Sequence, residues 1–492
     1  MMSTNQPTNP SSANPSDATP VFLEFHGAAG EVTGSRSVLR IGAGTGNNPV
    51  PLRIMVDCGL FQGSSDSRAQ NWEPTQPRPS DVSAVVLTHA HLDHSGRLPR
   101  YCREGYSGPI FCTDGTADLG KILLLDAAFL EEEQAAYARR TGYSRHKNPL
   151  PLFTEHDANL AIDHFKVVPR NEWQKLGEDV SFQFLRGGHI TGASMVQFAI
   201  GTGEISRIVT FSGDLGNERS LTMRPPVDLV ETDILVLEST YGSRVQNRRP
   251  ALEMLGSIIA RTIARKGVVV IPAFAVGRTQ EILYMIRLLE NQKAIPQVPV
   301  VLDSPMATAA TRTFLQHSED HQVATSFNGG PDGFLPRYFE TTHSSDESMA
   351  TCMREGPMII ISASGMLNGG RVLHHLKTRL PDPANSVIFV GYQAEGTKGR
   401  YLIEQGKEEG HIRIFHAEVP VEAEVESVDN LSAHADQEDL VEWVGRIQRR
   451  PKKIFLNHGS KESSEALKTR LEHAFPDIQI LPIHSPGEIR IM

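Results

Sequence analysis

The stretch VSAVVLTHAHLDH, residues 82–94, joins an apolar run to a cluster of metal-ligating side chains. Valine and leucine dominate its first half, which is typical of a buried strand. The candidate ligands that follow are His89, His91, Asp93 and His94. Imidazole and carboxylate are ligands that zinc accepts where no thiolate is present. One tetrahedral ion could not take all of these crowded ligands, but two neighbouring ions could divide them. The alternative is a chance histidine cluster on a surface loop.

Short apolar runs of the same kind recur along the chain, with helical patterns between several of them. The strand-like runs are residues 53–57, 181–189, 207–214, 233–238, 267–274, 357–364, 386–392 and 452–458. The clearest helical patterns are residues 117–140, 251–266, 279–292 and 436–448. Strands that alternate with helices predict an α/β protein whose sheets are covered by helices. The polar segment TTHSSDESMA, residues 341–350, is expected to be a loop.

Polar residues stand at the carboxyl ends of several of these runs. They are Asp57, His189, Asp214, Glu238 and His458. Any one of them alone would be interpreted as a strand-end cap or a satisfied polar group of the core. Because sites in α/β proteins form at the carboxyl edge of the sheet, their shared position favours a common site with the histidine cluster.

Bulk properties limit the class of protein. The chain has 492 residues and a net charge of −10, so it is not a protein coated with basic charge for non-specific nucleic-acid binding. Its four cysteines form no C-x-x-C pair, which predicts scattered thiols in a reducing compartment. No apolar stretch is long enough for a membrane span, and residues 1–20 are expected to be a disordered tail rather than a secretory signal. We therefore expect a cytoplasmic protein with no membrane partner.

The sequence HAHLDH resembles the H-x-H-x-D-H signature of the metallo-β-lactamase superfamily. GHITGA, residues 188–193, and FSGD, residues 211–214, are similar to its next two motifs. The resemblance implies one zinc ion held by His89, His91 and His189, and a second held by Asp93 and His94. It further implies that Asp214 bridges the two ions and that Asp57 orients a ligand histidine.

Further motifs resemble those of the β-CASP nucleases, and the likeness spans about residues 22 to 490. LESTYG (237–242), LSAHAD (431–436) and NHG (457–459) look like motifs A, B and C, with additional matches at PAFAVGR (272–278), DSPMA (303–307), SASGM (362–366) and GYQAEGT (391–397). Histidine rather than valine at position 458 is typical of the RNA-acting members and would complete the second zinc site. The chain is most similar to the compact bacterial members related to the mRNA 3′-end-processing endonuclease. Ser460 and Lys461 depart from the pattern, because glutamate is expected there.

The resemblance implies a definite architecture. A metallo-β-lactamase αββα sandwich is expected from residues 21–242 and 401–492, with a β-CASP α/β domain inserted at residues 243–400. The active site would lie in the cleft between the two domains, as ligand sites often do.

Motif B implies that His434 is the general acid for the leaving oxygen, with Glu238 holding its ring. The alternative is a structural histidine before a helix that begins near Asp436. Candidate phosphate contacts are Ser304, Ser364, Gly365 and Thr397, with charge added by Arg278 and Lys398. Each of these could instead be an ordinary turn residue. The basic runs at residues 244–249 and 449–453 could follow an RNA backbone or be solvated surface.

These observations predict a ribonuclease that uses two Zn²⁺ ions to hydrolyse single-stranded RNA. Endonuclease action is expected chiefly, and exonuclease action is a further alternative. The alternatives are a small-molecule metallohydrolase acting on thioesters or lactones, a DNA-acting nuclease, and a non-catalytic subunit on the same fold. The complete set of ligands argues against the last. The RNA target and the formation of a homo-oligomer are left open by the sequence.

Overall fold

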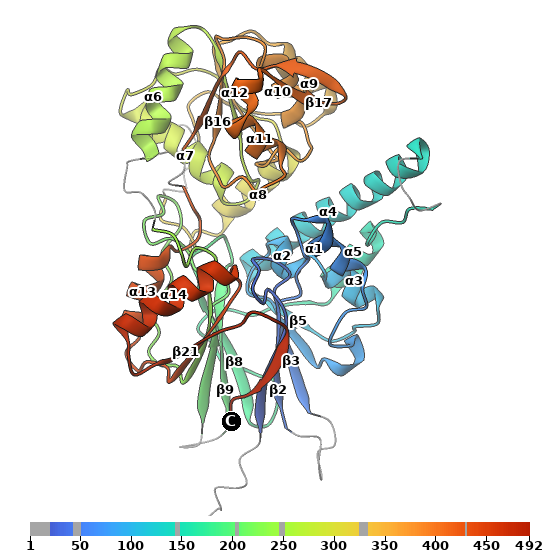
Figure 1. The fold of residues 1–492 in the computed structure, drawn as a ribbon, viewed down its shortest axis with the longest axis vertical. Helices are drawn as coiled ribbons and strands as arrows, with labels where there is room; N and C mark the ends of the chain where they lie inside the picture. The colour runs from blue at the N-terminus through green and yellow to red at the C-terminus, as the bar shows by residue number, and fades with distance from the viewer. Residues whose placement is uncertain are drawn as a thin grey trace, which may run out of the picture.

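The computed structural model describes residues 20–42, 51–142, 148–201, 206–245, 251–323, 333–428 and 431–492. The expected N-terminal tail lies outside these residues apart from Pro20. Figure 1 shows a two-sheet sandwich in the lower half of the molecule and a second α/β unit above it.

Two seven-stranded sheets form the sandwich. The first has the order β22 (Gly487–Arg490), β1 (Val21–Gly27), β2 (Arg36–Ile41), β3 (Leu52–Val56), β4 (Ala84–Val86), β5 (Ile110–Cys112) and β6 (Phe165–Val167). The second has the order β21 (Gln479–Pro482), β20 (Lys453–Asn457), β11 (Ile234–Glu238), β10 (Arg207–Phe211), β9 (Ser194–Ile200), β8 (Val180–Arg186) and β7 (Gln174–Lys175). Their inner faces share one apolar core that contains Phe25, Phe182 and Phe455.

Helices cover both outer faces of the sandwich, so the layers are αββα, as expected (Figure 1). The helices beside the first sheet are α1 (Ser65–Ala69), α2 (Leu92–Ser95), α3 (Leu98–Arg103), α4 (Asp114–Thr141) and α5 (Glu155–Asp163), with short 3-10 turns at Gln70–Trp72 and Pro79–Asp81. Those on the second sheet are α13 (Gln437–Arg446) and α14 (Lys461–Ala474). Trp443 of α13 is fully buried against this sheet, which fixes the position of the helix that follows motif B.

The inserted unit is built on a six-stranded sheet in which every pairing is parallel. Its order is β14 (Phe339–Thr341), β13 (Val300–Leu302), β15 (Met358–Ser362), β12 (Val268–Pro272), β16 (Ser386–Phe389) and β19 (Glu424–Ser427). One face of this sheet is covered by α6 (Ala251–Ala264), α7 (Arg278–Asn291) and α8 (Pro305–Gln316). The rest of the unit comprises four helices, α9 (Ser345–Met353), α10 (Val372–Arg379), α11 (Lys398–Glu404) and α12 (Gly406–Glu409). It also contains a hairpin of β17 (His411–Ile414) and β18 (Ala417–Pro420). Because other elements cover both faces of this sheet, β12 and β15 are buried on both sides and are continuous apolar runs.

The six-stranded sheet includes a strand beyond residue 400, where the sequence analysis placed the end of the inserted domain. β19 pairs in parallel with β16, from Ser386 opposite Glu424 to Phe389 opposite Ser427. The hairpin β17–β18 also packs on the core of this unit. We therefore propose that the inserted domain extends to about residue 428 and that the chain then returns to the sandwich.

The segment 341–350 is not a loop, as the sequence analysis expected. Helix α9 begins at Ser345, and the Ser344 side chain accepts a hydrogen bond from the Glu347 N–H. Its polar composition arises because Asp346 and Glu347 occupy the first turn, where the helix dipole favours acidic residues. All four cysteines are buried and unpaired, and among the described helices none combines the length and apolar character that a membrane span requires.

Candidate metal centre

The strands of the two sheets bring the predicted ligands to one edge of the sandwich. Asp57 follows β3 and His89 follows β4, while Asp214 follows β10 and His458 follows β20. Within each sheet these strands are parallel or joined through parallel neighbours, so their carboxyl ends point the same way. Both sheets therefore contribute predicted ligands to the same site.

A first cluster contains three imidazoles and one carboxylate. His91 Nδ1 lies 3.2 Å from His89 Nε2 and 3.1 Å from His189 Nε2. Asp214 Oδ2 lies 3.5 Å from His89 Nε2 and 3.7 Å from His189 Nε2. The four ligand atoms all fall within 4.8 Å of one another, as the ligands of one ion must.

A second cluster lies on the other side of Asp214. His94 Nε2 is 3.1 Å from His458 Nε2, and His458 Nε2 is 3.6 Å from Asp93 Oδ2. Asp214 Oδ1 lies 3.3 Å from His94 Nε2. The two oxygens of Asp214 thus face different clusters, which is the arrangement expected of a bridging carboxylate.

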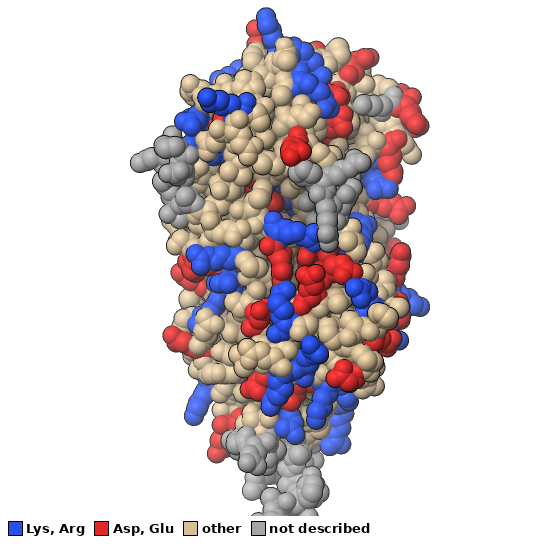
Figure 2. Space-filling view, turned by 90° about the vertical axis from the view of Figure 1, so that its left-hand side faces the viewer, with Lys and Arg blue, Asp and Glu red and all other residues tan. Residues whose placement is uncertain are grey.

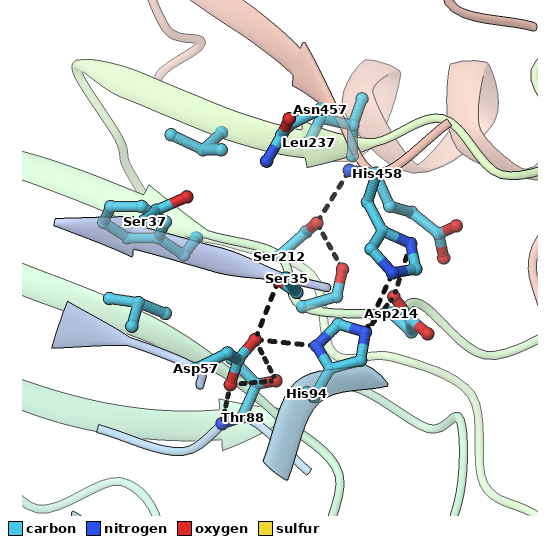
Figure 3. Close-up of a pocket in the computed structure, with 15 residues that line it drawn as sticks. Ser35, Ser37, Asp57, Thr88, His94, Ser212, Asp214, Leu237, Asn457 and His458 are labelled. Carbon is cyan, nitrogen blue, oxygen red and sulfur yellow. Dashed lines mark hydrogen bonds and ion pairs between the residues drawn. The ribbon is translucent and has the colours of Figure 1, made fainter. Parts of the chain in front are cut away.

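Neighbouring groups hold several of the ligand rings in place. Figure 3 shows the Asp57 carboxylate beside the His94 ring, and Asp57 Oδ2 lies 2.7 Å from His94 Nδ1. The same carboxylate accepts hydrogen bonds from the backbone and hydroxyl of Thr88. His189 Nδ1 faces the Ala433 carbonyl at 3.3 Å. Contacts of this kind turn the other ring nitrogen toward a metal.

The chemistry of this donor set fits metal ions. Burial and the neighbouring imidazoles hold the pKa values of His89 and His189 well below their ordinary value, so their rings are neutral ligands. Burial would raise the pKa of Asp214, but His458 and His94 lower it, so the carboxylate is charged. Within the described residues, Asp214 Oδ1 is buried and accepts no hydrogen bond. Converging nitrogen lone pairs and an orphaned carboxylate oxygen call for a cation.

His434 and Glu238 lie directly beside the first cluster. His434 Nδ1 is 3.3 Å from Glu238 Oε2, and its ring centroid is 4.4 Å from that of His189. Burial opposes protonation of His434, but the charges of Glu238 and Asp214 raise its pKa to about 9. Glu238 is itself fixed by the Leu215 N–H, which donates to Oε1 over 2.7 Å. His434 is one-fifth exposed, so it combines a cationic form with access to a substrate.

Two of the residues predicted to contact the substrate already bind other groups inside the inserted domain. Ser304 is buried and caps α8 by accepting the Ala307 N–H. Arg278 is buried at the start of α7 and forms an ion pair with Glu281. These positions do not favour contacts of either side chain with RNA.

The other four predicted contacts lie together at the carboxyl edge of the six-stranded sheet. Ser364 and Gly365 follow β15, and Thr397 and Lys398 follow β16. The Gln393 side chain ties the two loops together by donating to the Gly365 carbonyl over 2.9 Å. Thr397 caps α11 through its hydroxyl, while the partly exposed Lys398 has no ion pair with any residue of the described segments.

Sequence reasoning missed an aromatic and cationic group beside His434. The Tyr241 ring centroid is 5.6 Å from that of His434, and the Arg244 guanidinium lies over the Tyr241 ring at 5.4 Å. Tyr241 belongs to motif A and Arg244 to a basic run, but no periodic pattern links them to His434. The departure at Ser460 also has a local role, because its side chain caps α14. Arg248 and Arg249 lie outside the described residues.

The fold and the site together define a metallo-hydrolase with an inserted domain over its metal centre. Three family models match the chain: the metallo-beta-lactamase superfamily over residues 53–262, the Beta-Casp domain over residues 279–402, and the Zn-dependent metallo-hydrolase RNA specificity domain over residues 418–483. The chain is 37% identical to ribonuclease TTHA0252 of Thermus thermophilus over 90% of its own length and 94% of that protein. It therefore belongs to the β-CASP family of the metallo-β-lactamase superfamily.

Two further comparisons define the limits of the likeness. The chain is 32% identical to transcription termination factor FttA of Methanosarcina mazei, over 84% of this chain, but spans only 64% of that factor. A crystal structure of a protein of unknown function from Enterococcus faecalis V583 matches 96% of the chain and 100% of that protein, with a TM-score of 0.52 and 14% identity. The last likeness shows the fold alone.

Proposed function

We propose that this metallo-hydrolase is a ribonuclease that cuts single-stranded RNA, chiefly as an endonuclease, and uses two zinc ions. One observation carries the proposal. The seven predicted ligand side chains form two adjacent clusters, Asp214 of the first lies 3.3 Å from His94 of the second, and the pair His434–Glu238 lies beside them. The match to an RNA specificity domain and the likeness to a named ribonuclease support RNA as the substrate.

The residues of the site can be given roles. His89, His91, His189 and Asp214 would hold one ion, and Asp93, His94, His458 and Asp214 the other. Two such ions supply Lewis acidity and lower the pKa of water. His434 donates a proton to the leaving oxygen of the cut phosphodiester, and Glu238 keeps the ring oriented and protonated. Because the Nδ1 atom of His434 faces Glu238, we assign the Nε2 atom of His434 as the proton donor.

Surface charge supports a local rather than a global attraction for RNA. Figure 2 shows acidic and basic side chains interspersed over one face of the molecule, with no uniformly basic area. In the basic run at residues 449–453, Arg449 pairs with Glu231 at 2.5 Å and Arg450 lies over the Phe475 ring at 4.9 Å. Both contacts favour the interpretation of this run as surface structure. RNA contacts are therefore proposed at the loops that carry Gly365 and Lys398.

Cleavage of matched substrates tests the proposal. The protein, purified without chelator, is incubated with linear single-stranded RNA labelled at either end, with circular RNA, and with DNA of the same sequence. We expect RNA to be cut faster than DNA, circular RNA to be opened, and chelator to abolish both. A thioester serves as the small-molecule control. Faster cleavage of DNA, or hydrolysis of the thioester alone, would contradict the proposal.

Metal analysis tests the number and identity of the ions. We expect about two zinc ions per chain, loss of both in Asp214→Ala, and loss of the second in His458→Ala. Full activity with one ion or none would contradict this assignment. The cytoplasmic location and the oligomeric state stay predictions.

A further inference from the structure

Two large aromatic side chains are exposed at the edge of the inserted domain that carries the proposed RNA contacts. Phe274 is 42% exposed and Tyr392 is 48% exposed. Phe274 follows β12 and Tyr392 follows β16, and these strands are adjacent and parallel. Their carboxyl ends therefore share one edge with the loop after β15, which contains Gly365.

The backbone around Phe274 is shaped to leave room for its ring. A Cβ atom on Gly365 would lie 3.2 Å from Phe274 Cδ2, and one on Gly391 would lie 3.6 Å from Phe274 Cε2. Phe274 thus lies against two glycines, and a larger residue at position 365 would press on it. Gly391, one of these two glycines, directly precedes Tyr392 in the chain.

A continuous line of rings and one cation connects this edge to the catalytic pair. The Arg244 guanidinium carbon lies 5.3 Å from the Tyr392 ring centroid and 5.4 Å from that of Tyr241. The Tyr241 centroid lies 5.6 Å from that of His434. Arg244 thereby joins a tyrosine of motif A to a tyrosine of the inserted domain, across the boundary between the two domains.

We propose that Phe274 and Tyr392 form a stacking platform for the unpaired bases of RNA that flank the cut bond. The proposal rests on the ribonuclease function proposed above. Every base has an aromatic face, so aromatic side chains bind single strands with little sequence preference. The bases of a duplex already stack on one another and cannot use such a platform. Arg244 and Lys398 lie where they can attract the accompanying phosphates.

An abasic scan tests the platform. A single-stranded RNA oligonucleotide is made in versions that each lack one base, and KM for its cleavage is measured with the metal-loaded enzyme. For the wild type, we expect one or two positions near the cut bond where loss of the base raises KM by roughly 5- to 150-fold, the range for stacking on aromatic residues. In Phe274→Leu and Tyr392→Leu, KM for the intact oligonucleotide rises to a similar extent. The missing base at that position then has little further effect.

A matched control is Tyr338→Leu. Tyr338 is 57% exposed on the same domain, but it precedes β14, at the opposite end of the parallel sheet. Tyr338→Leu should show the same dependence of KM on base position as the wild type. Metal content is measured for each variant to show that the fold is retained. Unchanged scans in both platform variants would overturn the inference and assign the exposed rings to another partner. The dissociation constants of the same oligonucleotides separate the two proposals: if the wild type binds them with the expected base dependence but cuts none, the ribonuclease proposal fails and the platform stands.

Discussion

At the scale of single residues, the roles of His434 and the metal ligands can be separated. His434→Ala should retain both metal ions and the fold, because its ring lies beside the first cluster and not within it. It should lose RNA cleavage by roughly 10²- to 10⁴-fold, the usual contribution of a positioned proton donor. Glu238→Gln should behave similarly, because Glu238 acts through the histidine.

The control for this prediction is a substrate that needs no proton on its leaving group. Cleavage of a p-nitrophenyl phosphodiester should be far less sensitive to His434→Ala than cleavage of RNA. Equal loss on both substrates, or loss of metal, would show that His434 is a ligand or a structural residue.

Asp57 provides a second prediction at this scale. Its carboxylate lies within hydrogen-bond distance of His94 Nδ1, and its backbone has a positive φ of 63°. Asp57→Ala should lower metal affinity by about 10- to 100-fold, the usual effect of losing a group that orients a ligand. Asp57→Asn should do less harm, because asparagine tolerates this backbone conformation and keeps an acceptor oxygen. Competition with a chromophoric chelator measures the affinity. Equal affinity in the wild type and Asp57→Ala would exclude an orienting role.

At the scale of elements, Asp320 ties the inserted domain to the loop that carries His189. Its Oδ2 accepts the Gly192 N–H over 2.7 Å, and its Oδ1 pairs with Arg170. Asp320→Ala leaves a buried N–H and a partly buried guanidinium without their acceptor. We expect a loss of about 3–5 kcal/mol in the free energy of unfolding, together with weaker metal binding through the displaced His189.

Urea unfolding and metal titration measure these two effects. Lys121→Ala is the control, because it removes an exposed ion pair with Asp118 on α4. That change should cost less than about 1 kcal/mol. Matching stabilities for the two variants would mean that Asp320 does not couple the domains.

Within the inserted domain, the buried carboxylate of Asp303 should make the free energy of unfolding sensitive to acid. Burial would raise its pKa, but hydrogen bonds from His375, Ser348, Thr342 and Arg371 lower it well below the ordinary value. A carboxylate with a lowered pKa stabilises the fold above the ordinary carboxyl pKa of about 3.9, and this contribution is lost as the pH falls from there toward the lowered pKa. The free energy of unfolding should therefore fall more steeply between about pH 4 and pH 2 in the wild type than in Asp303→Asn. Parallel pH profiles of the two metal-free proteins would contradict this.

At the scale of the whole molecule, metal binding should join the two sheets of the sandwich. His94 belongs to the first sheet's edge, whereas Asp214 and His458 follow strands of the second. Free metal at 100 times its dissociation constant adds about 2.7 kcal/mol to the stability of the folded state. We expect the melting temperature to rise with the concentration of free zinc and to fall after chelation. A melting temperature that is independent of zinc would contradict a shared site.

The local pattern of the chain was enough to predict many of the elements and the side chains that converge at the candidate metal centre. The apolar runs at 207–214, 233–238 and 267–274 form β10, β11 and β12, and the pattern at 436–448 forms α13. Prediction failed at residues 341–350, because a short polar surface helix lacks a periodic apolar face. It also did not foresee that β19, beyond residue 400, pairs with β16, because parallel pairing is a non-local contact.

The candidate metal chemistry was predictable from the sequence alone, because ligand type and strand-end position both appear in nearby residues such as His89, His91 and Asp93. Only the tertiary structure decided which of the proposed RNA contacts are available. Ser304 follows β13 and Arg278 begins α7, and a helix cap and an ion pair respectively occupy their side chains. Phe274 and Tyr392 are exposed although they are apolar or aromatic. The direction and exposure of a side chain depend on what packs beside it, and that is fixed by contacts between residues far apart in the chain.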